Sequence, residues 1–190
     1  MSENKFIKML HSDFAEYIGL KPHLPVSEEN ELLDSTRWDL MSVYIQKSNF
    51  DDIPCRRFIK TAPEEYVREY ISKYPLYVDA LRELILRNDY ALLKMAIDRQ
   101  IFCVGEQRNI LRHGSDELLK KYFKDFCFAP PVEKELLQSG RTEVIACYLL
   151  DHKVWPSNRS LIPKELRKQN KNLGLWDKIT NLFSLKKHPS

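Results

Sequence analysis

An internal repeat of 26 residues constrains the fold of this chain more than any other feature of its sequence. Seven columns of residues, taken at steps of 26, hold only apolar side chains through five copies, without one insertion or deletion. Such a period is typical of repeated supersecondary units that stack on one another. The columns begin at Leu32, Leu33, Leu40, Met41, Tyr44, Ile45 and Phe50.

Within one unit the apolar residues follow a helical period. Leu40, Met41, Tyr44 and Ile45 fall at i, i+1, i+4 and i+5, which places them on one face of a helix. This spacing predicts a helix A of about three turns, a short corner, and a helix B of about two turns. Prolines fall at the predicted start of helix B, where a missing N–H costs least. They are Pro54, Pro130, Pro131 and Pro156.

A tight return is predicted between each helix B and the next helix A. The column 36, 62, 88, 114, 140 reads Thr, Ala, Asn, Gly, Gly. Its later members suit a left-handed residue just past a helix C-terminus. Asp89 and Ser115 are placed to cap helix A, and Pro63 fits its first turn.

These patterns predict an all-α fold: an α-solenoid (α-α superhelix) of about five tandem helical hairpins, with capping helices at both termini. At 190 residues and 43% hydrophobic content the chain is most simply a single domain over residues 1–190. We expect an N-terminal cap over residues 1–25, repeats over 26–160 and a basic C-terminal cap or tail over 161–190. Phe14, Ile18 and Leu24 lie one step before Leu40, Tyr44 and Phe50.

A shorter signature within the repeat runs from the end of helix B into helix A, and it is clearest at residues 110–123, which read Ile-Leu-Arg-His-Gly-Ser-Asp-Glu-Leu-Leu-Lys-Lys-Tyr-Phe. On these columns the chain resembles HEAT- and armadillo-like α-solenoids, with a shorter unit than the roughly forty residues of those families. It looks closest to short α-hairpin repeats of uncharacterised bacterial proteins. The resemblance covers about residues 10–165. It implies the binding of other macromolecules and brings no catalytic residue.

One exposed column of the predicted helix A is basic in its centre, where it holds Arg68, Lys94 and Lys120. Cations at this pitch could follow a phosphate backbone. The more frequent explanation is that Lys and Arg are good solvent-facing helix residues. The neighbouring column changes sign along the chain, from Lys47 to Asp125, so that no stripe of one charge runs its full length.

Tyrosines occupy one of the apolar columns, at positions 44, 70, 122 and 148. Aromatic side chains can stack on the bases of single-stranded nucleic acid. Because the fifth member of the column is Ala96, we instead expect the rings to be buried between units. Their hydroxyls should then reach the surface or a backbone carbonyl.

The C-terminal segment is basic, with nine Lys and Arg against three Asp and Glu from Asp151 to Ser190. It ends in an apolar helical stripe that includes Trp176 and Phe183. This stripe could lie on an anionic membrane or dock into a partner. Closure of the open end of the stack is the favoured interpretation, because the architecture needs a cap.

Short-range motifs for catalysis or metal binding are missing from the sequence. The four cysteines form no C-x-x-C and are expected to be reduced and mostly packed. The five histidines fall in turns or at the chain ends, and none is paired by short spacing with a carboxylate, Cys or Ser in a recognised motif. Five glycines supply no phosphate-binding loop. We therefore expect no enzyme activity, no cofactor and no metal.

The predicted function is a non-enzymatic module that binds a protein partner. The alternative is a nucleic-acid-binding HEAT-like protein, or an enzyme directed at nucleic acid, which would use Arg68, Lys94, Lys120 and the basic tail. Membrane attachment through Trp176 and Phe183 ranks third. A cytoplasmic location is expected, since the sequence shows no secretory signal and no apolar stretch of transmembrane length.

Overall fold

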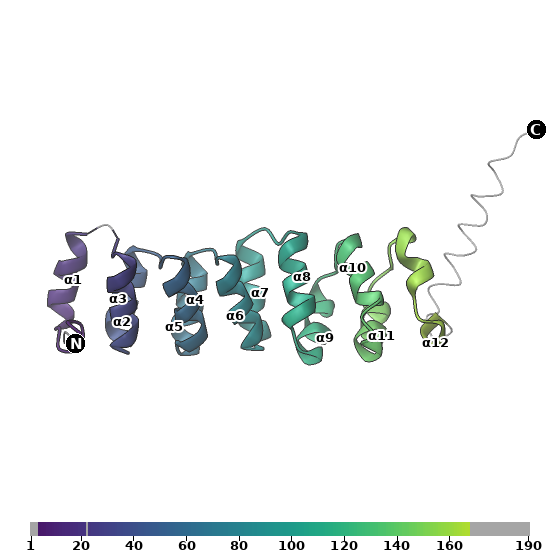
Figure 1. Cartoon of the computed structure of the whole chain (residues 1–190), viewed down its shortest axis with the longest axis horizontal. Coiled ribbons are helices and arrows are strands. Elements are labelled where there is room, and N and C mark those ends of the chain that lie inside the picture. The colour runs from purple at the N-terminus through teal and green to yellow at the C-terminus, as the bar shows by residue number, and fades with distance from the viewer. Residues whose placement is uncertain (1–3, 22, 168–190) are drawn as a thin grey trace, which may run out of the picture. The chain divides into compact units, whose positions relative to one another are not determined.

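A computed structural model describes residues 4–21 and 23–167, and every regular element in these ranges is a helix (Figure 1). The chain divides into two compact units, unit 1 ending at Gly114 and unit 2 beginning at Ser115. The predicted all-α fold, with helices packed on their neighbours in tandem, is confirmed. The single domain over residues 1–190 stays a prediction. No helix in the described ranges has the length and apolar character that crossing a membrane requires.

Unit 1 consists of two rows of helices. The A helices pack on one another in chain order, and the B helices do the same. The A row is α1 (His11–Gly19), α3 (Trp38–Lys47), α5 (Glu64–Lys73) and α7 (Tyr90–Arg99). The B row is α2 (Val26–Asp34), α4 (Asp52–Thr61), α6 (Val78–Leu86) and α8 (Val104–His113).

Unit 2 repeats this alternation. Helices α9 (Asp116–Asp125) and α11 (Thr142–Asp151) pack together, and α10 (Pro130–Leu137) packs on the 3₁₀ helix η1 (Pro156–Leu161). The short helix α12 (Lys164–Arg167) follows. Trp176 and Phe183, the predicted cap residues of the tail, lie outside the described residues.

The helices begin close to where the sequence predicts, but helix B is longer than expected. Helices B have eight to ten residues, against ten for the A helices after α1. The reason is that the apolar pairs lie near the C-terminal end of helix B, so its first turn carries a weak apolar signal. Pro54 lies in the first turn of α4, and Pro130 and Pro131 begin α10, as predicted. Pro156 begins a 3₁₀ helix instead.

The apolar columns form the core. Of the seven columns of five residues, only Tyr66, Ile97 and Phe102 remain half-buried, and all other members are buried. Fully burying a side chain of this size contributes about 1.5–3 kcal/mol, so the columns supply most of the driving force for folding. The cysteines differ from the prediction, because Cys103 and Cys127 are exposed instead of packed.

The returns from helix B to helix A alternate between two backbone conformations. Thr36, Asn88 and Gly140 have positive φ values of 53°, 60° and 75°. Ala62 and Gly114, which occupy the same column, have φ values of −68° and −70° and extended backbone. The left-handed prediction is therefore confirmed for Asn88 and Gly140 and is wrong for Gly114.

Helix length explains the difference. Helices α4 and α8 continue one residue further along the repeat than α2 and α6, so the column residue serves as the C-cap in an extended conformation. The predicted caps of helix A are confirmed. The side chains of Asp89 and Ser115 each accept a hydrogen bond from the backbone amide three residues further along the chain. Pro63 lies at the N-cap of α5 and not within its first turn.

Helix α1 packs on α3. A cluster of charged and polar side chains connects residues in and beside α1 to helix α2. Glu28 accepts hydrogen bonds from the Tyr17 hydroxyl and Lys21, and pairs with Lys5 at 2.9 Å. Burial by itself would raise the pKa of Glu28, but one hydroxyl and two ammonium groups outweigh it and lower this pKa to about 2. The contacts hold the N-terminal segment against the first helix B.

Candidate functional site

The tyrosine column is buried, as predicted, but its hydroxyls have unexpected partners. The Tyr44 hydroxyl donates to the Glu29 carboxylate at 2.6 Å, and the Tyr148 hydroxyl donates to Glu133 at 2.8 Å. Both glutamates are fully buried, at 0% exposure. The hydroxyls of Tyr44 and Tyr148 were predicted to reach the surface or a backbone carbonyl. That prediction is wrong for their shortest hydrogen bonds, because helix B supplies a carboxylate inside the core.

The two buried glutamates are equivalent in the repeat and hold their hairpins in the same way. Glu29 accepts the backbone amide of Asp51 at 3.0 Å, and Glu133 accepts that of Trp155 at 3.0 Å. Each carboxylate therefore joins its own helix B, the next helix A and the following corner. Such contacts are required, because a buried carboxylate without donors is strongly unfavourable.

The sequence contains a signal for this pairing. The column of Glu29 and Glu133 continues through Cys55, Leu81 and Gln107. In the hairpin that has Ala96 in place of tyrosine, the helix B residue is the apolar Leu81. In this column a residue other than an aliphatic one occurs only where a tyrosine follows fifteen residues later, and this covariation could have identified the contact.

Tyr70 is the exception in this column. Among the described residues, its hydroxyl is the one buried side-chain polar atom without a hydrogen-bond partner. Its helix B counterpart is Cys55, whose pKa burial raises to about 12, so that it remains a neutral thiol. A thiol is a weak hydrogen-bond partner, which leaves the Tyr70 hydroxyl poorly satisfied.

The substitution Tyr70→Phe is therefore expected to leave the free energy of unfolding unchanged or to raise it by about 1 kcal/mol. The matched substitution Tyr148→Phe removes a satisfied hydrogen bond to a carboxylate and should lower it by about 1–3 kcal/mol. Urea unfolding followed by circular dichroism measures both. A loss above about 1 kcal/mol for Tyr70→Phe would show that its hydroxyl has a strong partner after all.

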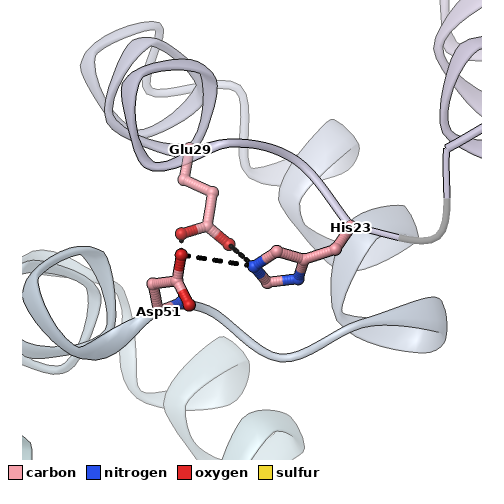
Figure 2. Close-up of side chains that lie close together, drawn as sticks. All are labelled: His23, Glu29 and Asp51. Atoms are coloured by element: carbon pink, nitrogen blue, oxygen red, sulfur yellow. Dashed lines mark hydrogen bonds and ion pairs between the residues drawn. The ribbon is translucent and has the colours of Figure 1, made fainter.

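The first corner of unit 1 adds two titratable side chains to the buried glutamate (Figure 2). His23 Nε2 lies 3.7 Å from Glu29 Oε1 and 3.4 Å from Asp51 Oδ2. The other ring nitrogen, Nδ1, is 2.8 Å from Ser48 Oγ. The side chains of His23 and Asp51 are 36% and 44% exposed, whereas that of Glu29 is 0% exposed. We call these three residues the first-corner cluster.

Three different elements position the cluster. His23 lies in the corner between α1 and α2, Glu29 lies in α2, and Asp51 is the N-cap residue of α4. Asp51 caps through its backbone, and its side chain makes no cap hydrogen bond, so the carboxylate is free to face His23. Sequence reasoning missed the cluster because it searched for short spacings, and these partners come from separate helices and corners.

Electrostatics at the cluster favour a positive group between the carboxylates. Burial raises the pKa of Glu29, and the hydrogen bonds from Tyr44 and the Asp51 amide offset only part of this effect. His23 Nε2 lies beside both carboxylates (Figure 2). A cation at this nitrogen would stabilise both of them.

The predicted basic column is already partly neutralised. Arg68 pairs with Glu64 at 2.5 Å, and Lys120 pairs with Glu143 at 3.0 Å. Lys94 is half-buried on α7. Arg68 and Lys94 belong to unit 1 and Lys120 to unit 2. The pairing reduces the charge that this column could offer to a phosphate backbone.

Large apolar side chains are exposed where helices B of unit 1 begin. Because α2, α4, α6 and α8 pack in order, these residues follow one end of the B row. Ile53 is 65% exposed and Ile101 is 92% exposed. We name this run the corner edge, and it consists of Val26, Ile53, Tyr77, Val78 and Ile101.

Comparison with known proteins adds no functional information. No protein-family model matches the chain, and searches of curated proteins and of solved structures find no match.

Proposed function

We propose that this chain is a non-enzymatic protein-interaction module, a helical repeat of HEAT- and armadillo-like type, whose corner edge contacts the partner. The observation that carries the proposal is the exposure of large apolar side chains at or just before the start of the B helices of unit 1, with Ile53 and Ile101 the most prominent. Apolar surface of this kind, when grouped, is a feature of interaction sites. Burying it against a partner contributes about 25 cal/mol per Å².

The charged residues near the corners have a local explanation that the apolar ones lack. Lys47, Lys73 and Arg99 lie in the last turn of A helices, where the helix dipole favours cations. Asp52 and Asp79 lie in the first turn of B helices, where the helix dipole favours anions. No comparable effect accounts for exposed isoleucines. The partner that fits this edge presents apolar side chains, with basic groups at the rim to meet the aspartates.

Capture from a native lysate of the source organism, repeated with cross-linking, tests the proposal. We expect the wild-type chain to retain one protein at stoichiometric levels, and the double variant Ile53→Ser/Ile101→Ser to lose at least about tenfold of this binding. The matched control is Leu150→Ser, which removes a side chain that is 78% exposed on α11 and should bind normally. Circular dichroism verifies that all three chains are folded.

Two results would overturn the proposal. One is the absence of any stoichiometric protein, and the other is equal capture by the wild type and the corner-edge variant. Nucleic-acid binding would appear as a salt-sensitive shift of DNA or RNA at low ionic strength, weakened by Arg68→Gln and Lys120→Gln. That outcome would replace the protein partner with a nucleic acid.

A further inference from the structure

We propose that the first-corner cluster, His23, Glu29 and Asp51, binds a divalent first-row transition-metal ion such as Zn²⁺. One imidazole nitrogen and two carboxylate oxygens from these residues all lie within 4.8 Å of one another. This inference is independent of the protein-interaction function.

The spacing of the ligand atoms fits a shared ion. In a tetrahedral zinc site with bonds of about 2.0–2.2 Å, neighbouring ligand atoms are separated by roughly 3.3 Å. His23 Nε2 lies 3.4 Å from Asp51 Oδ2 and 3.7 Å from Glu29 Oε1. Small movements of the two partly exposed side chains would therefore complete three protein ligands around one ion. Water would fill the fourth position.

The orientation of the imidazole supports a cation at Nε2. In Figure 2 this nitrogen faces both carboxylates, and a neutral acceptor nitrogen would be repelled by them. An N–H at Nε2, or a metal ion bound to this nitrogen, removes that repulsion. Nδ1 is 2.8 Å from Ser48 Oγ, and a metal-binding histidine commonly directs its second ring nitrogen to such an outer partner.

Glu29 is held in place as a metal ligand usually is. The Tyr44 hydroxyl binds Oε1 at 2.6 Å, and the Asp51 amide binds Oε2 at 3.0 Å. These contacts fix the carboxylate before any ion arrives. Fixed outer contacts of this kind raise metal affinity, because less ordering is needed on binding.

Unit 2 shows which of these residues the hairpin itself needs. There the equivalent Glu133 binds the Tyr148 hydroxyl and the Trp155 amide. Cys127 and Trp155 stand in the repeat positions of His23 and Asp51. The carboxylate, the tyrosine and the corner amide are thus sufficient for packing. His23 and the Asp51 side chain are additional, and they are the residue types that coordinate zinc.

Titration of the full-length chain with Zn²⁺ by calorimetry, and with Co²⁺ by visible absorption, tests the site. The background should carry Cys103→Ser, Cys127→Ser and Cys147→Ser, so that accessible thiolates do not bind the ions. We expect one ion per chain, and a loss of affinity of at least about tenfold in either His23→Asn or Asp51→Asn. Zn²⁺ should also raise the melting temperature of the background protein more than that of either variant.

Matched controls separate this site from surface binding. His152→Asn removes a half-buried histidine elsewhere, and Asp52→Asn removes the acidic neighbour of Asp51. Both should bind Zn²⁺ as the background does. Asp51→Asn keeps the backbone amide that binds Glu29, so its folding, checked by circular dichroism, should be normal. Absence of one-to-one binding, or equal affinity in the background and both ligand variants, would overturn the proposal and leave an imidazole N–H as the group that faces the two carboxylates.

Discussion

Replacing Glu133 by alanine is expected to lower the free energy of unfolding of unit 2 by about 4 kcal/mol. The substitution leaves three donors without their acceptor: the Tyr148 hydroxyl at 2.8 Å, the Asn158 side-chain amide at 2.9 Å and the Trp155 backbone amide at 3.0 Å. Each unsatisfied buried group costs about 1–3 kcal/mol. Urea unfolding gives the total, and hydrogen exchange over residues 115–167 assigns the loss to this unit.

A double variant identifies the source of this loss. Glu133→Ala combined with Tyr148→Phe removes one of the stranded donors together with its acceptor, so it should be more stable than Glu133→Ala alone by about 1 kcal/mol or more. Glu133→Gln, which keeps one carbonyl acceptor, should fall between the wild type and alanine. A loss below about 1 kcal/mol for Glu133→Ala would mean that water reaches the donors.

The second large effect is expected for Phe58→Ala in unit 1, which should cost about 3–5 kcal/mol. The Phe58 side chain is 0% exposed, and its ring centroid lies 5.0 Å from that of Phe50 and 5.4 Å from that of Tyr70. Alanine would leave a cavity among these aromatic rings, and the helices can close it only in part. Chemical denaturation of the full-length chain, with hydrogen exchange over residues 4–114, measures the effect.

Leu86→Ala provides the comparison for Phe58. Leu86 also belongs to a helix B, but its side chain is 54% exposed, so truncation should change stability by less than about 0.5 kcal/mol. Similar losses in the two variants would argue against the two-row packing of unit 1.

Most of the fold could be predicted from the sequence because each hairpin repeats the same local requirements. Columns such as Leu40 and Tyr44 combine a helical period with burial, and both properties are set by residues close in the chain. The errors occur where two local solutions compete. Gly114 suits a left-handed return, but a helix one residue longer makes an extended return available.

The first-corner cluster could not be predicted in the same way, because its geometry depends on tertiary placement. His23 appears in the sequence as an isolated turn residue, and Asp51 as an ordinary helix cap. His23 lies in the corner before α2, and Asp51 lies in the corner before α4. Only the packing of α2 on α4 brings both residues to the Glu29 carboxylate. The basic column was predicted from spacing alone, which carries no information on partners such as Glu64 and Glu143.

The alternating returns limit how a chain of this design can change in length. Positions 36, 88 and 140 turn through a left-handed residue, whereas 62 and 114 do not. Duplicating or deleting one hairpin would place two returns of the same conformation next to each other and break the alternation. A gain or loss of two hairpins, which is 52 residues, preserves the alternation. Natural or engineered length variants should therefore tolerate steps of 52 residues better than steps of 26.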